Sequence, residues 1–522
     1  MIITGDALIG GQSVKGTGAG VRAYNPATQQ VIDPEFRTVD AAQIDQACRL
    51  ADEAFDTFRA LSDDKRAVFL ETIADQIMEL GDVLVERVMA ETSLPRPRVE
   101  GERARTVGQL KLFANLLREG SWSDVRFDKA LPDRTPPRPD LRMRMIGLGP
   151  VAVFAASNFP LAFSVAGGDT ASALAAGCPV VLKAHFAHPG TSELVGRAVV
   201  KAVEICGLPA GVFSLLTGVG NELGIALVRH PAIKAVGFTG SRDGGLALMA
   251  AAAARPVPIP VYAEMSSINP VFLLPQALKN RAEDIAAGFA ASLTVGEGQM
   301  CTNPGLVLGI AGPDLDRFTA AASQALAGGA ACSMLSPGIA GNFARGVSQL
   351  VEHADVKTLA LAPQAEGKGA PALFVSSAAA FLSQHALQEE IFGPASLVVA
   401  CKDVAELRAV ADKLEGQLTA TLLMDEGDLE AAQSLLPVLE RKVGRILANG
   451  YPTGVEVCSA MVHGGPFPST SDGRTTSVGT GAISRFLRPV CYQNLSQALL
   501  PEVLRDNGSA KWLRREGELT RA

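Results

Sequence analysis

The chain has 522 residues, a length that predicts two or three domains, each large enough to bury its own core. Its 47 Lys and Arg residues against 54 Asp and Glu leave a net charge of −7, so no overall basic field attracts nucleic acid or an anionic membrane. Charged residues at 19% and apolar residues at 48% are typical of a globular chain rather than a disordered one.

The first third of the chain is predicted to be mainly helical after a turn-rich start. Apolar residues recur three and four positions apart over 39–61, 64–94 and 98–122, which predicts three long helices. Thr38 or Asp40 can cap the first of them. The Pro- and Arg-rich stretch 131–145 then predicts a linker or an arm rather than an element of the core.

The run from Ile146 to Gly168 contains no charged residue and is long enough to cross a bilayer. Prolines and glycines interrupt it, so a strand over 145–156, a turn at SNFP and a helix over 161–177 explain it better. Short apolar runs then alternate with helical stretches, which predicts parallel sheets. A second set of strands begins with VYAEM and ends with GRILAN, so we predict two α/β sheets with a site in the crevice between them.

The eight cysteines are spread singly, and none forms a C-x-x-C pair. This spacing does not indicate a zinc site or a thioredoxin-type motif, and we expect no metal. The first residues, MIITGDALIGGQSV, lack the basic and apolar segments of a signal peptide. Single thiols without an export signal predict the reducing cytoplasm as the location.

Two glycine-containing loops join predicted strands to predicted helices. TGVGNELG (217–224) and FTGSRDGG (238–245) would let backbone N–H groups at a helix start approach a phosphate. The spacing in the first loop is G-x-G-x-x-x-G rather than the dinucleotide fingerprint, so a tight strand-to-helix turn explains it equally well.

Other loops carry reactive side chains. GQMCTNPG (298–305) surrounds Cys301 with loop-forming residues, a setting that suits nucleophilic attack on a carbonyl, although a cysteine is more often a small buried hydrophobe. Glu264 ends the strand VYAE and Asn158 lies in the turn ASNFP. Either is ordinarily a cap, surface or turn residue, but the positions also suit a base and an oxyanion donor. QEEIFGP (388–394) by itself would be a solvated loop.

Together these motifs have the order and spacing of NAD(P)-dependent aldehyde dehydrogenases: ASNFP, LK at 182–183, FTGS, EMSS at 264–267, GQMC at 298–301 and EEIFGP. The chain resembles that family over about residues 20–495. The variants EMSSINPVFLLP, GQMCTNPG and HGGPFPST (463–470) are similar to the branch that contains α-ketoglutaric semialdehyde (2,5-dioxopentanoate) dehydrogenases.

The resemblance implies a mechanism through a cysteine thioester. Cys301 matches the thiolate nucleophile, and Asn158 together with the Cys301 backbone N–H matches the oxyanion donors. Glu264 matches the base that activates water, and an apolar crevice would raise the pKa of that carboxylate. The resemblance also assigns the cofactor to Lys183, Gly220, Gly224, Gly240, Ser241, Gly245, Glu390 and Phe392.

One departure from the family bears on the cofactor. Phe186 stands where NAD-preferring relatives commonly place a glutamate that binds the 2′-hydroxyl. The resemblance therefore implies that NADP is favoured and NAD possible, with His185 or His188 near Lys183 as further partners of a 2′-phosphate.

The implied reaction oxidises 2,5-dioxopentanoate to 2-oxoglutarate, with Arg105 or Arg474 as the partner of the distal carboxylate, although either arginine by itself can simply pack or pair at the surface. A broad-specificity or medium- to long-chain fatty aldehyde dehydrogenase is the alternative. A non-catalytic binding protein on the same fold is a more distant one.

The implied fold is α/β, with a Rossmann-like cofactor-binding domain, an α/β catalytic domain and a small β oligomerisation arm. We place the cofactor-binding domain at 1–130 and 150–262, the catalytic domain at 263–460, and the arm with the C-terminal tail at 131–149 and 480–522. The expected partners are a small aldehyde and further copies of the chain, in a homodimer or homotetramer. No nucleic acid and no membrane partner is expected.

Overall fold

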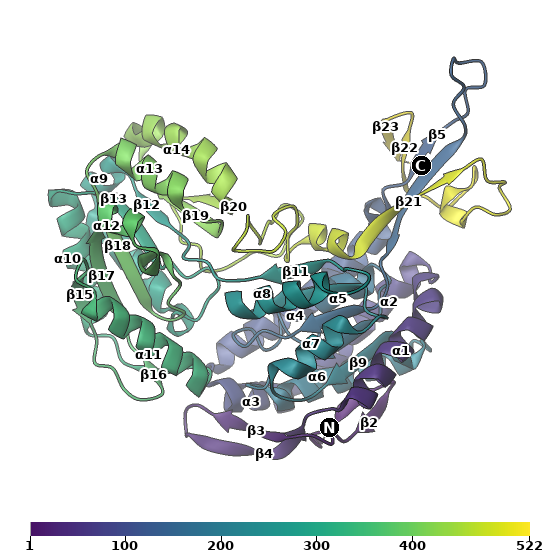
Figure 1. The fold of residues 1–522 in the computed structure, drawn as a ribbon, viewed down its shortest axis with the longest axis horizontal. Helices are drawn as coiled ribbons and strands as arrows, with labels where there is room; N and C mark the ends of the chain where they lie inside the picture. The colour runs from purple at the N-terminus through teal and green to yellow at the C-terminus, as the bar shows by residue number, and fades with distance from the viewer. Residues whose placement is uncertain (1, 522) are drawn as a thin grey trace.

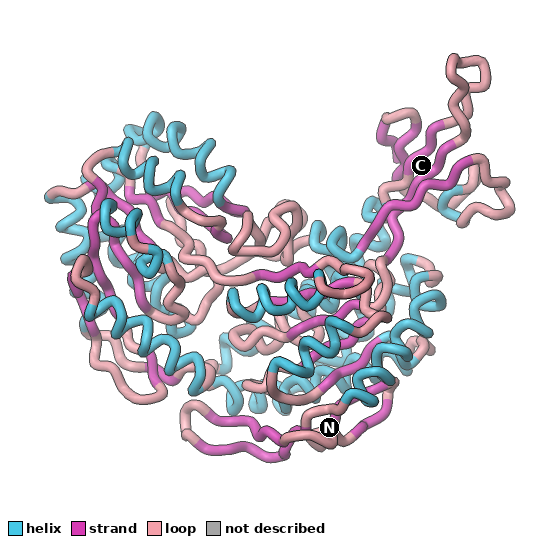
Figure 2. Tube along the Cα trace, viewed as in Figure 1, coloured by secondary structure: helices cyan, strands magenta, loops and turns pink. Residues whose placement is uncertain are grey.

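The computed structural model describes residues 2–521 and has the α/β fold that the sequence predicts. Figure 1 shows two α/β lobes side by side, and a narrow arm that projects away from them and carries the C-terminus. Helices surround the strands of each lobe, whereas the arm consists mainly of strands and loops (Figure 2). None of the helices within 2–521 is both long enough and apolar enough to span a bilayer.

The first lobe is built on a seven-stranded sheet in the order β11-β10-β7-β8-β9-β1-β2, whose first five strands are parallel. Along β7, Val151 and Val153 join one core cluster while Ala152 and Phe154 join another. Burial on both faces explains why such strands are continuous apolar runs. The strands are β1 (Ala7–Ile9), β2 (Gln12–Val14), β7 (Val151–Phe154), β8 (Val180–Lys183), β9 (Phe213–Leu216), β10 (Ala235–Thr239) and β11 (Val261–Glu264).

The helices of this lobe confirm some expectations and correct others. Asp40 caps the first helix through a capping box with Gln43, as the sequence predicts. The helix expected over 64–94 is two helices, because the chain breaks at Gly81, whose φ is +54°. The helices are α1 (Ala41–Arg59), α2 (Asp63–Glu79), α3 (Gly81–Thr92), α4 (Arg96–Glu119), α5 (Gly168–Ala175), α6 (Pro189–Ile205), α7 (Asn221–Arg229) and α8 (Arg242–Ala253).

The helix expected over 161–177 begins only at Gly168. The backbone N–H groups of Leu161 and Ala162 instead donate to the buried carboxylate of Glu102, over 2.8 and 3.0 Å. This carboxylate on α4 holds the segment as an irregular loop, and Asn158 lies just before it. A side chain distant in sequence therefore overrides the local helical preference.

The second lobe has a seven-stranded sheet in the order β15-β17-β18-β13-β12-β19-β20, parallel except for β15. VYAE, expected to begin this set, is β11 and extends the first sheet, because it pairs with β10. The elements are β12 (Val271–Leu273), β13 (Leu306–Ile310), β15 (Lys357–Leu361), β17 (Ala372–Ser377), β18 (Ala395–Cys401), β19 (Gln417–Leu423), β20 (Val443–Ala448), α9 (Pro275–Thr294), α10 (Pro313–Ala327), α11 (Pro337–Glu352), α12 (Ala378–Ser383), α13 (Val404–Lys413) and α14 (Leu429–Lys442).

The arm is a five-stranded sheet in the order β21-β6-β5-β22-β23. The strand expected over 145–156 is two strands, β6 in the arm and β7 in the first lobe, so the chain leaves the arm between them. Strand β5 lies within 1–130, the range predicted to belong to the cofactor-binding domain, but it pairs with β6 in the sheet of the arm. The arm strands are β5 (Arg126–Asp128), β6 (Leu141–Gly147), β21 (Leu487–Gln493), β22 (Trp512–Arg515) and β23 (Glu518–Arg521).

Two small sheets complete the strands. The hairpin of β3 (Gly20–Asn25) and β4 (Gln30–Arg37) lies at the edge of the first lobe (Figure 1). A short antiparallel pair, β14 (Cys332–Ser333) and β16 (Lys368–Gly369), belongs to the second lobe.

Candidate active site

A cavity of about 970 Å³ is lined by residues of both lobes. It lies beyond the carboxyl ends of β7, β10 and β11, where parallel α/β sheets usually bind their ligands. Its volume is that of a site for a sizeable organic ligand. The lining includes most of the residues singled out from the sequence, namely Asn158, Gly240, Ser241, Glu264, Cys301, Glu390 and Phe392.

Cys301, Glu264 and His463 meet at this cavity. Nε2 of His463 lies 3.4 Å from Sγ of Cys301, in hydrogen-bonding geometry, and 2.9 Å from Oε1 of Glu264. The other carboxylate oxygen accepts a hydrogen bond of 2.9 Å from Ser477. The sequence predicts no metal site. One potential metal-ligand atom from each of Cys301, Glu264 and His463 nevertheless lies within 4.8 Å of the other two. Among residues 2–521 this is the one cluster of His, Cys and acidic side chains with that spacing.

The electrostatics of the site differ from the expectation for Glu264. Burial alone would raise the pKa of this carboxylate, but His463 and hydrogen bonds from Ser477 and Cys301 outweigh burial and lower it. Glu264 is therefore ionised at neutral pH, which corrects the expected raised pKa.

The pKa of the Cys301 thiol shifts in the opposite direction. Burial, followed by the charge and hydrogen bond of Glu264 and the charge of Glu390, raises the pKa of Cys301 well above its usual value, and Arg105 opposes the rise. The thiol is thus protonated at rest. It needs a nearby acceptor for its proton before it can act as a nucleophile.

The loop that carries Cys301 is held by backbone contacts. The buried Asn269 amide donates to the carbonyl oxygens of Cys301 and Asn303, each over 2.9 Å. Gly298 has φ +66°, and a Cβ there would lie 2.4 Å from backbone atoms of Gly393. Only glycine fits so strained and close a position, so the loop is fixed against the chain before β18.

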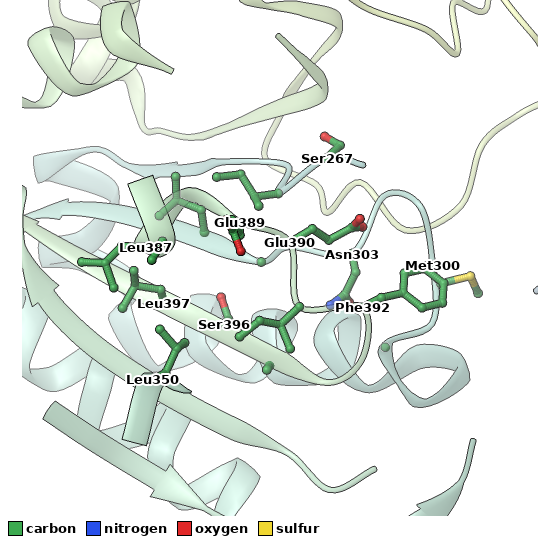
Figure 3. A pocket seen from close by; sticks show the side chains of 17 residues that line it. Ser267, Met300, Asn303, Leu350, Leu387, Glu389, Glu390, Phe392, Ser396 and Leu397 are labelled. Atoms are coloured by element: carbon green, nitrogen blue, oxygen red, sulfur yellow. The ribbon is translucent and has the colours of Figure 1, made fainter. Parts of the chain in front are cut away.

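Glu390 and Phe392 lie on that neighbouring chain segment. Figure 3 shows them close to Met300 and Asn303 of the cysteine loop. Burial raises the pKa of Glu390 to about 7, although hydrogen bonds from Ser266 and Ser267 oppose the rise. This carboxylate therefore changes its charge near neutral pH.

Asn158 approaches the cysteine loop from the first lobe. Its side-chain amide donates to the carbonyl oxygen of Gln299, two residues before Cys301, over 3.0 Å. Residues 156–158 follow β7, so the amide comes from the carboxyl end of a central strand. The structure thus brings Asn158, Cys301 and Glu264 together at one cavity, as the sequence predicts.

The glycines assigned to the cofactor have different surroundings. Gly240 and Ser241 line the cavity at the start of α8, and the Ser241 hydroxyl accepts from the backbone N–H of Gly244. A Cβ on Gly245 would lie 2.5 Å from the sulfur of Met265, so that glycine permits close packing of helix and strand. Gly245 does not line this cavity.

The other glycine loop lies farther from it. Gly224 packs against Phe154, and Gly220, with φ +88°, precedes α7. Neither glycine lines the cavity, so the assignment of this loop to the cofactor stays a prediction beside the alternative of a strand-to-helix turn.

The surroundings of Lys183 limit the groups that can meet a phosphate. Lys183 ends β8, and burial lowers the pKa of its amine. His188 is buried, with Nε2 2.8 Å from the carbonyl of Ala156, so it is not available. Burial, then the charges of His188 and Lys183, lower the pKa of His185 well below 6.5, which leaves that ring uncharged at neutral pH. Phe186 is exposed and lines the cavity beside His185.

The two arginines predicted for the substrate lie in different places. Arg474 is exposed and forms a two-pronged ion pair with Asp472, outside the cavity that contains Cys301. Arg105 is partly buried on α4, next to the ring of Phe163. The structure does not bring Arg474 to the site, because its local ion pair holds it in solvent. Arg105 does not line the cavity either, although it lies near the thiol.

A second arginine, Arg445 on β20, lies near the thiol. Burial lowers the pKa of both Arg105 and Arg445 while charge on Cys301 raises it, so both guanidinium groups are within charge–charge range of that sulfur. Arg105 donates to the carbonyl of Val455, and Arg445 donates to that of Gly454. Within 2–521 neither arginine forms an ion pair, and each keeps a buried Nε without a hydrogen-bond partner.

Sequence reasoning missed His463 and Arg445. HGGPFPST was noted as a motif, but its glycines and prolines indicate only a loop, and no neighbouring residue suggests that its histidine reaches a thiol. Arg445 lies in the strand GRILAN, where an arginine ordinarily points to solvent. In both cases the signal exists only in the folded chain.

A comparison with protein families matches the aldehyde dehydrogenase family over residues 14–485. The chain therefore belongs to that family, and it is an oxidoreductase that acts on aldehydes with NAD(P).

Two relatives are similar to this chain over nearly its whole length. The chain is 58% identical over 511 residues to alpha-ketoglutaric semialdehyde dehydrogenase 2 of Azospirillum brasilense, covering 97% of both chains. It is 49% identical over 506 residues to the alpha-ketoglutaric semialdehyde dehydrogenase of Acinetobacter baylyi, covering 96% of both. Among solved structures, aldehyde dehydrogenase C of Pseudomonas syringae, complexed with NAD⁺ and octanal, has a similar fold, with a TM-score of 0.80 at 23% identity over 95% of this chain and 98% of that one.

Proposed function

We propose that this aldehyde dehydrogenase oxidises 2,5-dioxopentanoate to 2-oxoglutarate through a thioester on Cys301. Two relatives with near full-length coverage are named for this semialdehyde, at 58% and 49% identity. The observation that carries the proposal is the pair Arg105 and Arg445, two cations near the thiol that lack a carboxylate partner among the described residues.

The residues of the site suit the family's cofactor. The cavity is large, Ser241 and the backbone N–H groups at the start of α8 face it, and the Glu390 carboxylate can accept from a ribose hydroxyl. When bound, the nicotinamide supplies the hydride acceptor. This chain's residues then have to hold the aldehyde, form the thioester and direct a water to it.

Cys301 attacks the aldehyde carbon, and the oxyanion that forms receives hydrogen bonds from Asn158 and the Cys301 backbone N–H. Removing one such donor commonly costs about 2.7–4 kcal/mol in the barrier. After hydride leaves, the remaining thioester is cleaved by water. Glu264 is ionised and lies at the same cavity, so it can take the proton of that water.

We further propose that NADP is used at least as well as NAD. Phe186 lines the cavity where an acid would repel a 2′-phosphate, and Lys183 is close in the chain at the end of β8. Since His188 is buried and His185 is uncharged, Lys183 is the partner that supports this preference.

The arginine pair supports an acidic substrate on physical grounds. A guanidinium group binds a carboxylate through two parallel charge-assisted hydrogen bonds. Arg105 and Arg445 donate to consecutive backbone carbonyls, those of Val455 and Gly454, so their side chains meet at one loop beside the cysteine. A buried Nε left without a partner on each arginine is the donor that a carboxylate would satisfy.

The test is the ratio of kcat/KM for 2,5-dioxopentanoate to that for an uncharged aldehyde of similar length. A hydrogen bond to a charged group contributes about 1.5–3 kcal/mol, so Arg105→Ala or Arg445→Ala should lower the ratio roughly tenfold to a hundredfold. Arg474→Ala, on an exposed and locally paired arginine, is the matched control and should leave it unchanged.

The proposal fails if the uncharged aldehyde has the higher kcat/KM and neither buried arginine affects use of the acid. A broad-specificity or medium- to long-chain aldehyde dehydrogenase would then be the better description.

We also propose a homodimer or homotetramer in the cytoplasm. The arm projects from the body with a small apolar core of its own, formed by Val125, Phe127, Leu500, Leu504 and Leu513. An extended sheet of this kind leaves strand edges that a second copy can cover. Sedimentation equilibrium of the full chain and of a chain without residues 130–138 would test the role of the arm.

A further inference from the structure

We propose that His463 is a catalytic residue: its Nε2–H hydrogen-bonds Sγ of Cys301 and stabilises the thiolate that forms when Glu264 takes the thiol proton. The inference rests on the proposed role of Cys301 as the nucleophile. It adds His463 to Cys301 and Glu264, the nucleophile and the base that the sequence analysis identified.

The first support is the placement of the imidazole. His463 is buried, and its backbone is held in place: its N–H donates to Thr476 and its carbonyl accepts from the backbone N–H of Ser477, each over 2.8 Å. Phe163 lies against the ring, with the two ring centres 6.1 Å apart. Burial and the contact with Phe163 therefore restrict rotation of the imidazole away from the sulfur.

The second support is the position of the proton on the ring. Nε2 has two negatively polarised neighbours, Sγ of Cys301 at 3.4 Å and Oε1 of Glu264 at 2.9 Å. Nδ1 is buried and has no hydrogen-bond partner among the described residues. A lone pair on Nε2 would face both acceptors, so the ring carries its hydrogen on Nε2. The contact with Sγ has the geometry of a hydrogen bond.

The third support is the energetic cost of forming the Cys301 thiolate, which a hydrogen-bond donor lowers. The pKa of Cys301 is raised by burial first and then by Glu264 and Glu390, so the thiolate is costly to form. Arg105 and Arg445 are the cations that act on the sulfur from other elements. An N–H aimed at the sulfur lowers the cost of the thiolate.

The proton balance of the step is simple. The S–H bond of Cys301 breaks, its electrons stay on sulfur, and the proton forms an O–H bond on the Glu264 carboxylate. The N–H of His463 stays intact and its hydrogen bond strengthens, because sulfur now bears the negative charge. Glu264 later releases the proton to solvent and is again free to take one from water.

Two substitutions separate a hydrogen-bond role from a packing role. His463→Phe keeps a ring next to Phe163 but removes the donor, whereas His463→Gln keeps an N–H that can reach the sulfur. The measurement is the rate of alkylation of Cys301 by iodoacetamide against pH, without cofactor or aldehyde, together with kcat. Mass spectrometry of the peptide that contains Cys301 identifies the alkylated site.

We expect His463→Phe to slow alkylation at pH 7 about tenfold or more, to move the pH midpoint upward and to lower kcat with little change in KM. His463→Gln should stay within about threefold of the native enzyme. Both should keep the native melting temperature within a few degrees. If the Phe variant does not fold, His463→Met, apolar and flexible, takes its place.

A native alkylation profile in the Phe or Met variant overturns the inference, and so does a Gln variant as impaired as the Phe variant. Cys301→Ala distinguishes this failure from a failure of the proposed function. If iodoacetamide inactivates the native enzyme at another cysteine, or if Cys301→Ala still turns over aldehyde, the assignment of the nucleophile is wrong.

Discussion

Replacement of Glu264 by glutamine tests the order of events in the site. The substitution keeps the shape of the side chain, and the hydroxyl of Ser477, 2.9 Å from Oε2, can still bond the new amide. What is lost is the charge. Because the pKa of Glu264 is lowered, the native carboxylate is ionised at pH 7–8 and available as a base.

General base catalysis contributes about 10²–10⁴-fold, which corresponds to roughly 2.7–5.4 kcal/mol of the barrier. We therefore expect kcat of Glu264→Gln to fall by that factor because the thioester is hydrolysed slowly. The first turnover should still occur, since Cys301 and Asn158 are intact, although more slowly because the thiol proton has lost its acceptor.

The assay is rapid mixing of enzyme, NAD(P) and aldehyde with absorbance at 340 nm as the readout. We expect a burst of about one reduced cofactor per active site, followed by a slow steady rate, and a thioester on the Cys301 peptide by mass spectrometry. A kcat within threefold of native, or a variant that shows neither a burst nor a thioester, would refute the assignment of Glu264 to hydrolysis.

Four further predictions follow from the site. Cys301→Ala should abolish aldehyde oxidation but leave cofactor binding by fluorescence titration intact, and substantial remaining turnover would contradict the role of the thiol. Initial rates at matched concentrations should show NADP used at least as well as NAD, and Lys183→Ala should weaken NADP more; a preference for NAD above tenfold would refute this. Since the pKa of Glu390 is raised to about 7, its carboxylate is neutral below and ionised above that pH, so cofactor affinity should rise with pH through 7 and level off, and Glu390→Gln should flatten the curve. Gly298→Ala should destabilise the fold by about 1–3 kcal/mol and lower activity, because its Cβ would clash with the backbone of Gly393, and an unchanged melting temperature would argue against it.

Much of the architecture was predictable because it depends on local patterns. The short apolar runs of β7, β8 and β9, which alternate with helical stretches, indicated strands of a parallel sheet, and the glycine and proline positions marked the loops between them. The errors occurred where a distant group intervenes. The carboxylate of Glu102 prevents a helix at Leu161 and Ala162, and β11 pairs with β10 rather than with the strands that follow it.

The sequence by itself determined the class of chemistry, since the loops around Cys301, Glu264 and Asn158 occur as local motifs in a recognisable order. Only the tertiary structure decided how these groups are tuned. His463 is 162 positions from Cys301 in the chain, and its imidazole lowers the pKa of Glu264, which burial alone would raise. Arg105 and Arg445 come from different lobes to one loop, while Arg474 is held in solvent by Asp472. Charge, burial and hydrogen-bond partners depend on distances in space, and residue order along the chain does not contain those distances until the chain has folded.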